Sequence, residues 1–430
     1  MFLPDDYNIV WQSADALTPY ANNPRTHSKA QIRQIADSIR EFGWTNPVLV
    51  DGTGGVIAGH GRLAAAKLLD MAEVPTLQLE HMSEAQKRAY VIADNKLAEN
   101  AGWDVDLLRI ELQGLDEIDF DLSLTGFGTP ELDGLLFGDQ TDAPDPRDTL
   151  PETDPGATPV SQLGDLWLLG DHRLFCGDAT KAESWTQLMA GETAQMIFTD
   201  PPYNVPIRGH VSGLGQVRHR EFAMAAGEMS AAEFTDFLKT VLGQMARVSA
   251  DGAIHFVCMD WAHLFELLSA GQEVYSALKN ICVWAKSNGG MGSLYRSQHE
   301  MVAVFKAGSA PHINNVELGK HGRYRTNVWN YAGMNSFGAE RDDALAMHPT
   351  VKPVALVRDA ILDCSERGGI VVDAFLGSGT TLIAAEAIGR RCFGMELDPL
   401  YADLIVRRWQ TQTGQQAVQV GSGLTFDDLV

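Results

Sequence analysis

The stretch from Ile370 to Glu396 constrains the fold of this chain more than any other part of the sequence. It contains an apolar strand (Ile370 to Phe375), a helical pattern (Thr380 to Ile388) and a second apolar strand (Cys392 to Glu396). Short apolar strands that alternate with helical patterns predict a parallel sheet with helices on both faces. We therefore expect an α/β domain in this part of the chain.

The same alternation is present upstream. Strands are predicted at Gln195 to Thr199 and Ala253 to Met259, and helices at Ala231 to Arg247, Trp261 to Ser269 and Tyr401 to Trp409. Two more strand-like runs, Asn280 to Lys286 and Glu300 to Lys306, are joined by a loop rich in Gly and Ser. This arrangement predicts a hairpin at one edge of the sheet.

A segment rich in Pro, Asp and Thr, from Gly138 to Pro159, divides the chain into two parts. Few apolar residues occur in it, which is the composition of an extended, solvated linker. The sequence thus predicts a first domain at residues 1–137, an acidic Pro-rich linker at 138–160 and a second domain at 161–430. A length of 430 residues with 45% hydrophobic content agrees with two packed domains.

The first part has the pattern of a small α/β unit. It predicts a helix that His27 caps or precedes and that Gly43 ends, strands at Pro47 to Asp51 and Val56 to Ala58, and helices at Arg62 to Leu69 and Ser83 to Asn100.

Charge is distributed unevenly. The formal net charge of -23 disfavours a protein that coats DNA without specificity, because contacts with phosphates need Lys and Arg. Sixteen acidic and two basic residues lie between Asp104 and Asp165, so this segment is not expected on a phosphate backbone. Seven basic and two acidic residues lie between Lys279 and Asn330, so a polyanion is expected to dock there.

Other sequence features exclude several classes of protein. The five cysteines are far apart and form no CxxC pair, so we expect reduced, mostly buried thiols and no metal site. The sequence has no apolar run long enough to span a membrane, and its first residues lack the pattern of a signal peptide. We expect a cytoplasmic protein without a membrane partner.

A glycine-rich loop follows the strand that begins at Ile370. Its sequence, Asp373-Ala-Phe-Leu-Gly-Ser-Gly-Thr-Thr381, lets a ligand approach the backbone, and Glu396 ends the next strand where a ribose-binding carboxylate belongs. Neither a GK[ST] sequence nor GxGxxG is present, which excludes a P-loop and disfavours a dinucleotide. An acid at position 373 favours a cofactor with a positive end, such as S-adenosyl-L-methionine.

A second loop, Asp200-Pro-Pro-Tyr-Asn204, follows the strand at Met196 to Phe198. Two prolines make the turn rigid and remove two backbone donors, so that a carboxylate and carbonyl oxygens form a corner of acceptors. Such a corner suits an amino group with two hydrogens: accepting both N–H bonds at Asp200 and the Pro201 carbonyl favours a pyramidal nitrogen with a free lone pair. Tyr203 offers a face for stacking on a base.

With these motifs the chain resembles the amino-group DNA methyltransferases, and their order is similar to the β group of that family. The resemblance covers about Leu163 to Gln410. It includes Gly177-Asp178, Asp200 to Tyr203, His348-Pro-Thr-Val-Lys-Pro353, the loop at 373–381 and Glu396. It implies a Rossmann-like sheet with a permuted motif order, with double-stranded DNA as substrate and adenine N6 as target. A base in a duplex must be flipped out before it can react.

The motifs and the resemblance together give the following predicted site. Catalytic residues are Asp200, Pro201, Pro202 and Tyr203. Cofactor-binding residues are Asp178, Lys352, Asp373, Phe375, Gly377, Ser378, Gly379, Thr380 and Glu396. The recognition region is expected around residues 306–346, and the predicted DNA contacts there are Lys320, Arg323 and Arg325.

The first domain, from Asn23 to about Trp103, resembles the ParB N-terminal fold. Gly59-His60-Gly61-Arg62 stands where that family has a phosphate-binding box, which has two adjacent arginines in its typical form. The sequence therefore leaves open whether this domain binds CTP or another nucleotide, since the motif also fits a glycine turn with an arginine at a helix start. The sequence likewise leaves a homodimer open.

Two alternative functions remain at this stage. One is methylation of cytosine N4, because both amines need the same corner of acceptors; that family more often has Ser where Asp200 stands. The other is a non-catalytic ParB-like DNA-binding adaptor with an inactive second domain, which the intact Asp200 and Asp373 disfavour.

Overall fold

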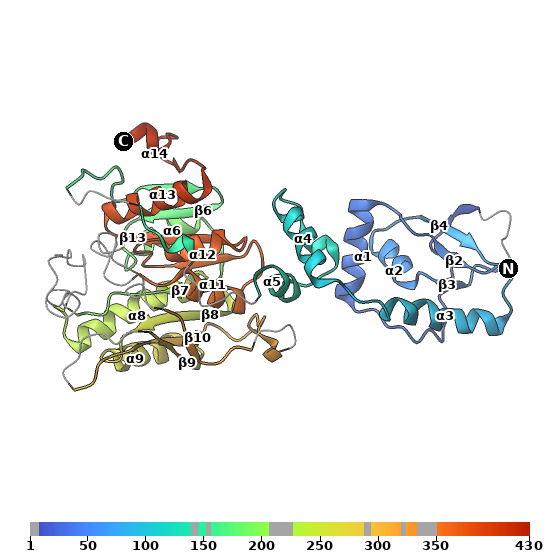
Figure 1. Ribbon diagram of the computed structural model, residues 1–430, viewed down its shortest axis with the longest axis horizontal. Coiled ribbons are helices and arrows are strands. Elements are labelled where there is room, and N and C mark those ends of the chain that lie inside the picture. The colour runs from blue at the N-terminus through green and yellow to red at the C-terminus, as the bar shows by residue number, and fades with distance from the viewer. Residues whose placement is uncertain are drawn as a thin grey trace. The chain divides into compact units, whose positions relative to one another are not determined.

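The structure is a computed structural model of the chain (Figure 1). It describes residues 8–138, 145–151, 156–205, 227–287, 294–319, 324–332 and 351–430. The chain divides into two compact units, Met1–Phe137 and Gly138–Val430.

The first unit contains a four-stranded sheet with the order β1-β4-β2-β3. β4 pairs with β1 antiparallel and with β2 parallel, and β2 and β3 form an antiparallel hairpin. The elements of the sheet and its helices are β1 (Ile9–Ser13), α1 (Lys29–Phe42), β2 (Val48–Val50), β3 (Val56–Ala58), α2 (His60–Leu68), β4 (Glu73–Gln78) and α3 (Glu84–Glu99). The predicted small α/β unit is confirmed, although Ser28, not His27, caps α1 by accepting from Gln31 N.

Three short helical elements complete the first unit and were not predicted. They are α4 (Val105–Asp116), the 3-10 turn η1 (Leu122–Thr125) and α5 (Thr129–Phe137). Their buried leucines pack into a small separate core of Leu112, Leu122, Leu132 and Leu136. The many acids of this stretch conceal the pattern in the sequence, but Asp104 and Asp121 accept hydrogen bonds at the starts of α4 and η1, where acids are favourable.

The second unit is organised around a ten-stranded sheet with the order β11-β9-β10-β8-β7-β12-β13-β6-β5-β14. Its central strands, β8, β7, β12, β13 and β6, are parallel to one another, and β10 is antiparallel to both β8 and β9. The strands are β5 (Leu166–Leu169), β6 (His172–Cys176), β7 (Ala194–Thr199), β8 (Ser249–Met259), β9 (Ala277–Ala285), β10 (His299–Lys306), β11 (Val328–Asn330), β12 (Ile370–Asp373), β13 (Arg391–Glu396) and β14 (Val418–Gln419). The predicted α/β sheet and its hairpin near one edge are confirmed.

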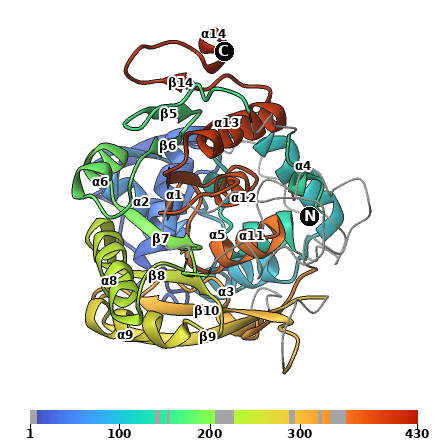
Figure 2. The ribbon, with the colours of Figure 1, turned by 90° about the vertical axis from the view of Figure 1, so that its left-hand side faces the viewer.

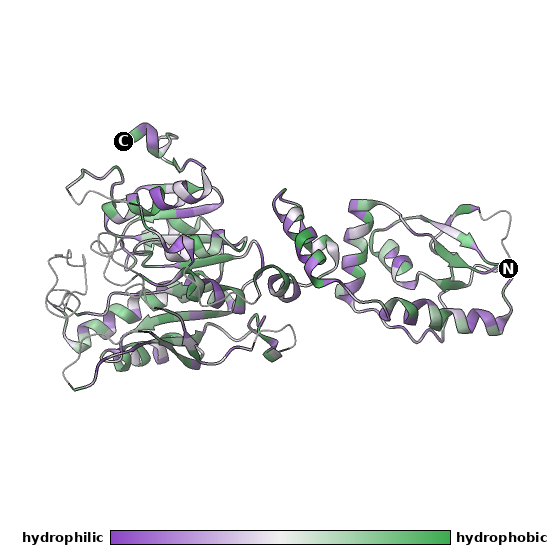
Figure 3. Cartoon of the chain, in the orientation of Figure 1, coloured by the Kyte–Doolittle hydropathy of each residue, from purple (hydrophilic) through white to green (hydrophobic). Residues whose placement is uncertain are grey.

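Helices cover both faces of this sheet (Figure 2). One group lies along one face, α6 (Ala182–Met189), α8 (Ala231–Val248) and α9 (Leu264–Val274), and another lies along the opposite face, α11 (Val354–Cys364), α12 (Thr380–Glu386) and α13 (Pro399–Thr413). Smaller elements are η2 (Pro146–Asp148), η3 (Glu317–Gly319) and α14 (Phe426–Leu429). The strands between these layers are strongly apolar (Figure 3). In β7, Met196 and Ile197 are fully buried, as expected for a strand covered on both faces.

The prediction of a solvated linker at 138–160 is wrong for its described part around η2. Residues 145–151, which we call the docking segment, pack against the rest of the second unit, and Asp145, Asp148 and Leu150 are buried. The Arg147 carbonyl accepts hydrogen bonds from Arg408 and Gln412 of α13. The acid-rich composition suggested that this segment is solvated. Asp145 and Asp148 instead lie near the buried arginines Arg358 and Arg408.

The cysteines are arranged as predicted. Four of the five are buried and Cys364 is partly buried, and all five are free thiols. Among the described residues, no helix is both long enough and apolar enough to cross a membrane.

Candidate active site

The two loops singled out in the sequence lie at adjacent strand ends. β7 and β12 are parallel neighbours, with Val372 opposite Ile197. From β12 the chain passes through α12 to β13 on one side, and from β7 it passes through α8 to β8 on the other. In open α/β sheets, ligands bind at the carboxyl ends of the strands where the strand order reverses in this way. Asp200 and Asp373 therefore lie at the ends of two strands at the expected position.

Asp373 is held firmly beneath its loop. Its Oδ1 accepts from Thr199 Oγ1 (2.8 Å) and Phe375 N (3.0 Å), and its Oδ2 accepts from Thr381 Oγ1 (2.6 Å). Burial raises the pKa of Asp373 to about 6, although these hydrogen bonds oppose the shift. The contact with Thr199, the last residue of β7, connects the two loops directly.

Glu396, at the end of β13, closes the other side of the loop. Its Oε2 accepts from Gly377 N (2.9 Å) and its Oε1 from Asp398 N (2.9 Å). Burial raises the pKa of Glu396 to about 7. The glycine is required here because Gly377 has a φ of 53°, in the left-handed region that side chains disfavour.

Asp178 lies next to Glu396 because β6 pairs with β13. Cys176 is opposite Glu396, and Gly177 N donates to the Glu396 carbonyl (2.9 Å). The Asp178 carboxylate accepts from the backbone N and the hydroxyl of Thr180. Asp178, Asp373 and Glu396, all predicted for cofactor binding, thus end or follow three neighbouring parallel strands.

The hydroxyls of Ser378 and Thr380 are used inside the protein. Both residues are buried, and Arg408 Nη1 donates to the Ser378 carbonyl (2.9 Å) and lies 3.3 Å from Thr380 Oγ1. Gly379 has a φ of 84° and caps α12, and a Cβ at this position would lie 3.1 Å from the Ile405 side chain. These residues shape the loop, and contacts with a cofactor would come from its backbone.

Residues of the second loop contact one another. Tyr203 OH donates to Asp200 Oδ1 (2.5 Å), and Pro201 is buried while Pro202 is partly buried. Asn204 follows with a φ of 54°, and its side chain binds the backbone at Met229. The loop is therefore fixed on both sides of the Asp200 carboxylate.

Lys352 was predicted to bind cofactor, but the structure places it on Asp200. Its Nζ donates to Asp200 Oδ2 (2.6 Å) and Tyr203 OH (3.2 Å), and it lies 2.8 Å from Glu300 Oε2. Val351 and Pro353 flank it, whereas His348 to Thr350 of the same motif lie outside the described residues. Lys352 is thus a shared cation between two carboxylates.

Glu300 and Lys286 were missed in the sequence. Glu300 belongs to β10 and lies opposite Trp284 of β9. Lys286, which follows β9, forms an ion pair with Glu300. A signal was available, because Glu300 directly precedes the apolar run Met301 to Phe305, and a buried charge requires a partner. The partner could not be identified, since Lys352 lies far away in the sequence.

Charges in this cluster act on one another. Burial raises the pKa of Asp200, Lys352 opposes that shift, and the carboxylate of Glu300 adds to it. Burial also acts to raise the pKa of Glu300, but Lys352 and Lys286 bring it below its usual value. Asp200 is therefore the carboxyl of the two that is closer to accepting a proton.

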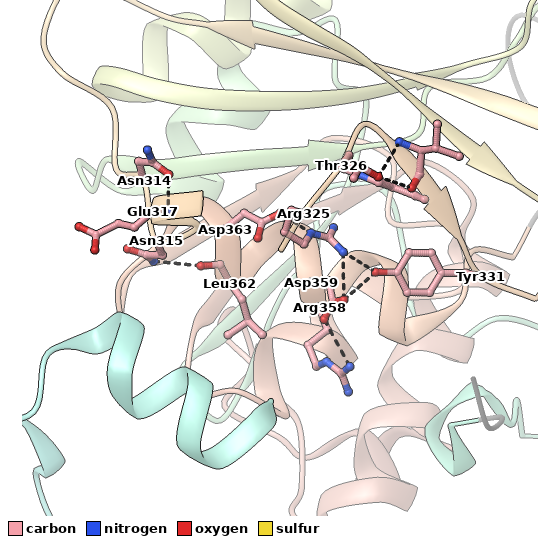
Figure 4. Close-up of polar contacts among 12 residues, drawn as sticks. Asn314, Asn315, Glu317, Arg325, Thr326, Tyr331, Arg358, Asp359, Leu362 and Asp363 are labelled. Atoms are coloured by element: carbon pink, nitrogen blue, oxygen red, sulfur yellow. Dashed lines mark hydrogen bonds and ion pairs between the residues drawn. The ribbon is translucent and has the colours of Figure 1, made fainter. Parts of the chain in front are cut away.

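Arg325, one of the predicted DNA contacts, is held by side chains of the same unit. Arg325 forms ion pairs with Asp359 (3.2 Å) and Asp363 (3.1 Å) of α11, and its Nη1 donates to Tyr331 OH (2.8 Å), as Figure 4 shows. The arginine is thus an internal tie between α11 and the segment that leads to β11. Lys320 and Arg323 lie outside the described residues.

In the first unit, the Gly59-His60-Gly61-Arg62 motif forms a glycine turn at the start of α2. Gly59 has a φ of 95°, and His60 Nε2 accepts from Tyr20 N (3.2 Å). Arg62 Nη2 donates to the Pro47 carbonyl (3.4 Å). The motif is therefore a glycine turn with an arginine in the first turn of a helix.

Comparisons with known proteins cover nearly the whole chain. Residues 194–407 match the model of a DNA methylase family that includes N6 and N4 enzymes, residues 106–163 match a ParB-methyltransferase HTH domain, and residues 8–96 match the ParB N-terminal domain. The first unit is similar to the ParB-like nuclease domain-containing protein YnaK of Escherichia coli, with 46% identity over 86 residues, 20% of this chain and 99% of that protein. The second unit is similar to the DNA adenine methyltransferase YhdJ of the same species, with 27% identity over 242 residues, 50% of this chain and 76% of that protein.

Two of the solved structures similar to this chain cover more than half of it. A complex of M1.HpyAVI with SAM is 19% identical, with a TM-score of 0.41 over 55% of this chain and 97% of that one. The cytosine-N4-specific PvuII enzyme is 17% identical, with a TM-score of 0.42 over 59% of this chain and 89% of that one. Taking the matched models together, the chain carries a ParB N-terminal domain, a ParB-methyltransferase HTH domain and, after them, a domain of the DNA methylase family.

Proposed function

We propose that this methylase transfers a methyl group from S-adenosyl-L-methionine to the N6 amino group of adenine in double-stranded DNA. The observation that carries the proposal is the contact between Thr199 Oγ1 and Asp373 Oδ1 at 2.8 Å. Through it, the loop with the acceptor corner at Asp200 lies beside the loop suited to the cofactor. A methyltransferase needs this proximity, because both reactants must meet in one geometry.

The chemistry of the donor set fits the cofactor. Asp373 and Glu396 are buried carboxylates whose pKa burial raises, so each gains from a bound hydrogen-bond donor or cation. In our proposal Glu396 holds the ribose hydroxyls and Asp373 the positively charged end, while Gly377 and Gly379 let the ligand approach the backbone. S-adenosyl-L-methionine supplies a methyl group activated by the positive charge on its sulfur.

Asp200 and the carbonyl of Pro201 act on the target amine. Both are acceptors only, so they take its two N–H bonds and favour a nitrogen with an available lone pair. Tyr203 and Lys352 hold the two oxygens of Asp200 in place. When the nitrogen gains a carbon it must release one proton, and Asp200 is the group in contact that can accept it.

The target base has to leave the helix to reach this corner. Flipping it out costs roughly a few kcal/mol, and stacking on an aromatic face returns about 1–3 kcal/mol. Tyr203 is the proposed stacking residue. Lys320 and Arg323 remain proposed DNA contacts, whereas Arg325 supports the recognition region from within.

Adenine is the proposed target over cytosine. The similarity to YhdJ, which is named an adenine methyltransferase, supports this choice, as does an aspartate at position 200. The corner itself accepts any amine with two hydrogens, so the ring edge and the size of the site must discriminate.

The product of the reaction tests this proposal. We expect N6-methyladenine as the major modified nucleoside when the purified protein, labelled cofactor and bacterial DNA are incubated and the DNA is digested. Label found chiefly in N4-methylcytosine would change the base and keep the mechanism. Absence of label from every nucleoside would contradict the proposed function and favour a non-catalytic adaptor.

The cofactor assignment has a separate test. Asp373→Ala and Glu396→Ala should each weaken binding of the cofactor by about 1.5–3 kcal/mol, the usual contribution of a hydrogen bond to a charged group. Calorimetric titration of the cofactor measures this. Asp251→Ala serves as the control, because Asp251 lies near the start of β8 and binds the backbone of Ser309 and Ala310, away from the cofactor loop. Unchanged affinity in either variant would remove that residue from the site.

A further inference from the structure

The docking segment, residues 145–151, contacts residues that support both loops of the active site. Asp148 Oδ1 accepts from Val354 N (2.8 Å), the first residue of α11. The Arg147 carbonyl accepts from Arg408 Nη2 (2.8 Å), and the same arginine donates to the Ser378 carbonyl of the cofactor loop (2.9 Å). The docking segment therefore contacts both Val354, which lies next to Lys352 in the chain, and Arg408, which binds the cofactor loop.

Asp148 accepts a hydrogen bond at the N-terminus of α11, where the N-cap residue of the helix has no side-chain acceptor. The N-cap is Pro353, which has no side-chain acceptor for the free N–H groups of the first turn. Asp148 supplies the acceptor from 206 residues away, and its negative charge also suits the positive end of a helix. Only Pro353 separates Val354 from Lys352. The hydrogen bond from Val354 N to Asp148 therefore helps to fix the position of Lys352 relative to Asp200.

The segment also balances buried positive charge below the cofactor loop. Arg408 is 1% exposed, and burial lowers the pKa of Arg408 to about 10, against the raising effect of Asp148 and Asp145. Asp145 lies 4.0 Å from Arg358, a second buried arginine, in α11. A buried arginine without nearby acids would be strongly unfavourable.

We propose that the docking segment positions the active site, with Asp148 as a positioning residue that acts through Val354 on Lys352 and through Arg408 on the loop at Ser378. This inference rests on the proposed function, since it assigns Lys352 and the loop to methyl transfer. According to this proposal, the acidic docking segment positions catalytic residues and does not serve only to connect two domains.

Kinetics of the full chain provide the first test. In Asp148→Ala we expect kcat to fall between about tenfold and a hundredfold, since a shift of about 1 Å in a catalytic group can have an effect of that size. The KM for DNA should change little. Asp148→Asn keeps an acceptor of the same shape for Val354 N but loses the charge beside Arg408, so it should recover part of kcat. Thr425→Ala, which removes the cap of α14 in the same unit, should retain the parent's kcat.

The acid limb of the pH profile of kcat provides a second test, because general destabilisation of the fold does not shift this limb. A displaced Lys352 leaves Asp200 with less positive charge, so the acid limb of kcat in Asp148→Ala should move to higher pH. The titratable groups that act on Asp200 and Lys352 are Tyr203 of the same loop, Glu300 of β10 with its partner Lys286, Cys258 of β8 and Asp373 of β12. The parent's kcat and acid limb in Asp148→Ala, or an equal loss in Thr425→Ala, would overturn the inference.

Hydrogen exchange separates this inference from the proposed function. Whether or not the protein methylates DNA, Asp148→Ala should speed exchange at the amide of Val354, and Asp148→Asn should restore its protection. If the alanine variant does not fold, Asp148→Glu replaces it, because one extra methylene misplaces the acceptor while keeping the charge. Unchanged exchange at Val354 in the folded variant would overturn the docking role, and absence of methylation by the parent would overturn only the proposed function.

Discussion

Asp200→Ala should abolish methyl transfer and leave cofactor binding nearly intact. The carboxylate acts on the target amine, while the cofactor is assigned to Asp373 and Glu396. Loss of a preorganised polar partner at a reacting group lowers kcat by about 10²–10³-fold. Here the loss should be at the upper end or beyond, because Asp200 is also the proton acceptor. Rates of label transfer to DNA, measured beside calorimetric titration of the cofactor, check both halves of this expectation.

The variant should still fold. Lys352 keeps Glu300 as a partner at 2.8 Å after Asp200 is removed, so no buried cation is left uncompensated. Asp251→Ala, which removes an aspartate from the opposite end of the parallel strands, should keep the parent's activity. Near-normal activity of Asp200→Ala would contradict the catalytic assignment, and a parallel loss of cofactor affinity would mean that Asp200 serves both substrates.

Lys352→Met should lower both activity and stability, with a characteristic dependence on pH. The methionine fills the space but leaves Asp200 and Glu300 as two buried carboxylates without their shared cation. Removing one partner of a buried ion pair costs about 3–5 kcal/mol. Repulsion between the carboxylates then raises the pKa of Asp200 further, so the acid limb of kcat should move to higher pH.

The free energy of unfolding should follow the same shift. A carboxyl group whose folded-state pKa lies above its unfolded value stabilises the fold below the unfolded value, and that contribution is lost as pH rises through the folded pKa. The deficit of Lys352→Met relative to the parent should therefore be smallest in acid and grow toward neutral pH. Denaturant titrations at a series of pH values measure it.

A double variant tests whether Glu300 causes the effect. Lys352→Met with Glu300→Gln removes one of the two carboxylates, so part of the lost stability and part of the acid-limb shift should be recovered. Lys239→Met, which breaks an exposed ion pair with Glu273 on the surface, should behave as the parent does. If the single Lys352→Met variant keeps the parent's acid limb, Lys352 does not set the ionisation of Asp200.

Periodic patterns in the sequence located most of the regular elements and the two central loops. The apolar runs that became β7, β8, β12 and β13 were recognised within a few residues, because burial on both faces dictates local composition. Asp200 and Asp373 were singled out for the same reason: each stands at the end of such a run, beside prolines or glycines that fix the backbone. The helices α4 and α5 were not predicted, because acidic residues are interspersed among their few apolar positions.

Contacts between distant residues were decided only by the tertiary structure. The sequence by itself determined the α/β sheet, the edge at which the site lies and the residue types of its acceptor corner, because these depend on neighbours along the chain. It did not determine that Lys352 would bridge Asp200 and Glu300, that Arg325 would turn inward to Asp359 and Asp363, or that Asp148 would cap α11. In each case a buried charge or free backbone group needs a partner, and packing brings that partner from a part of the chain that no local pattern specifies.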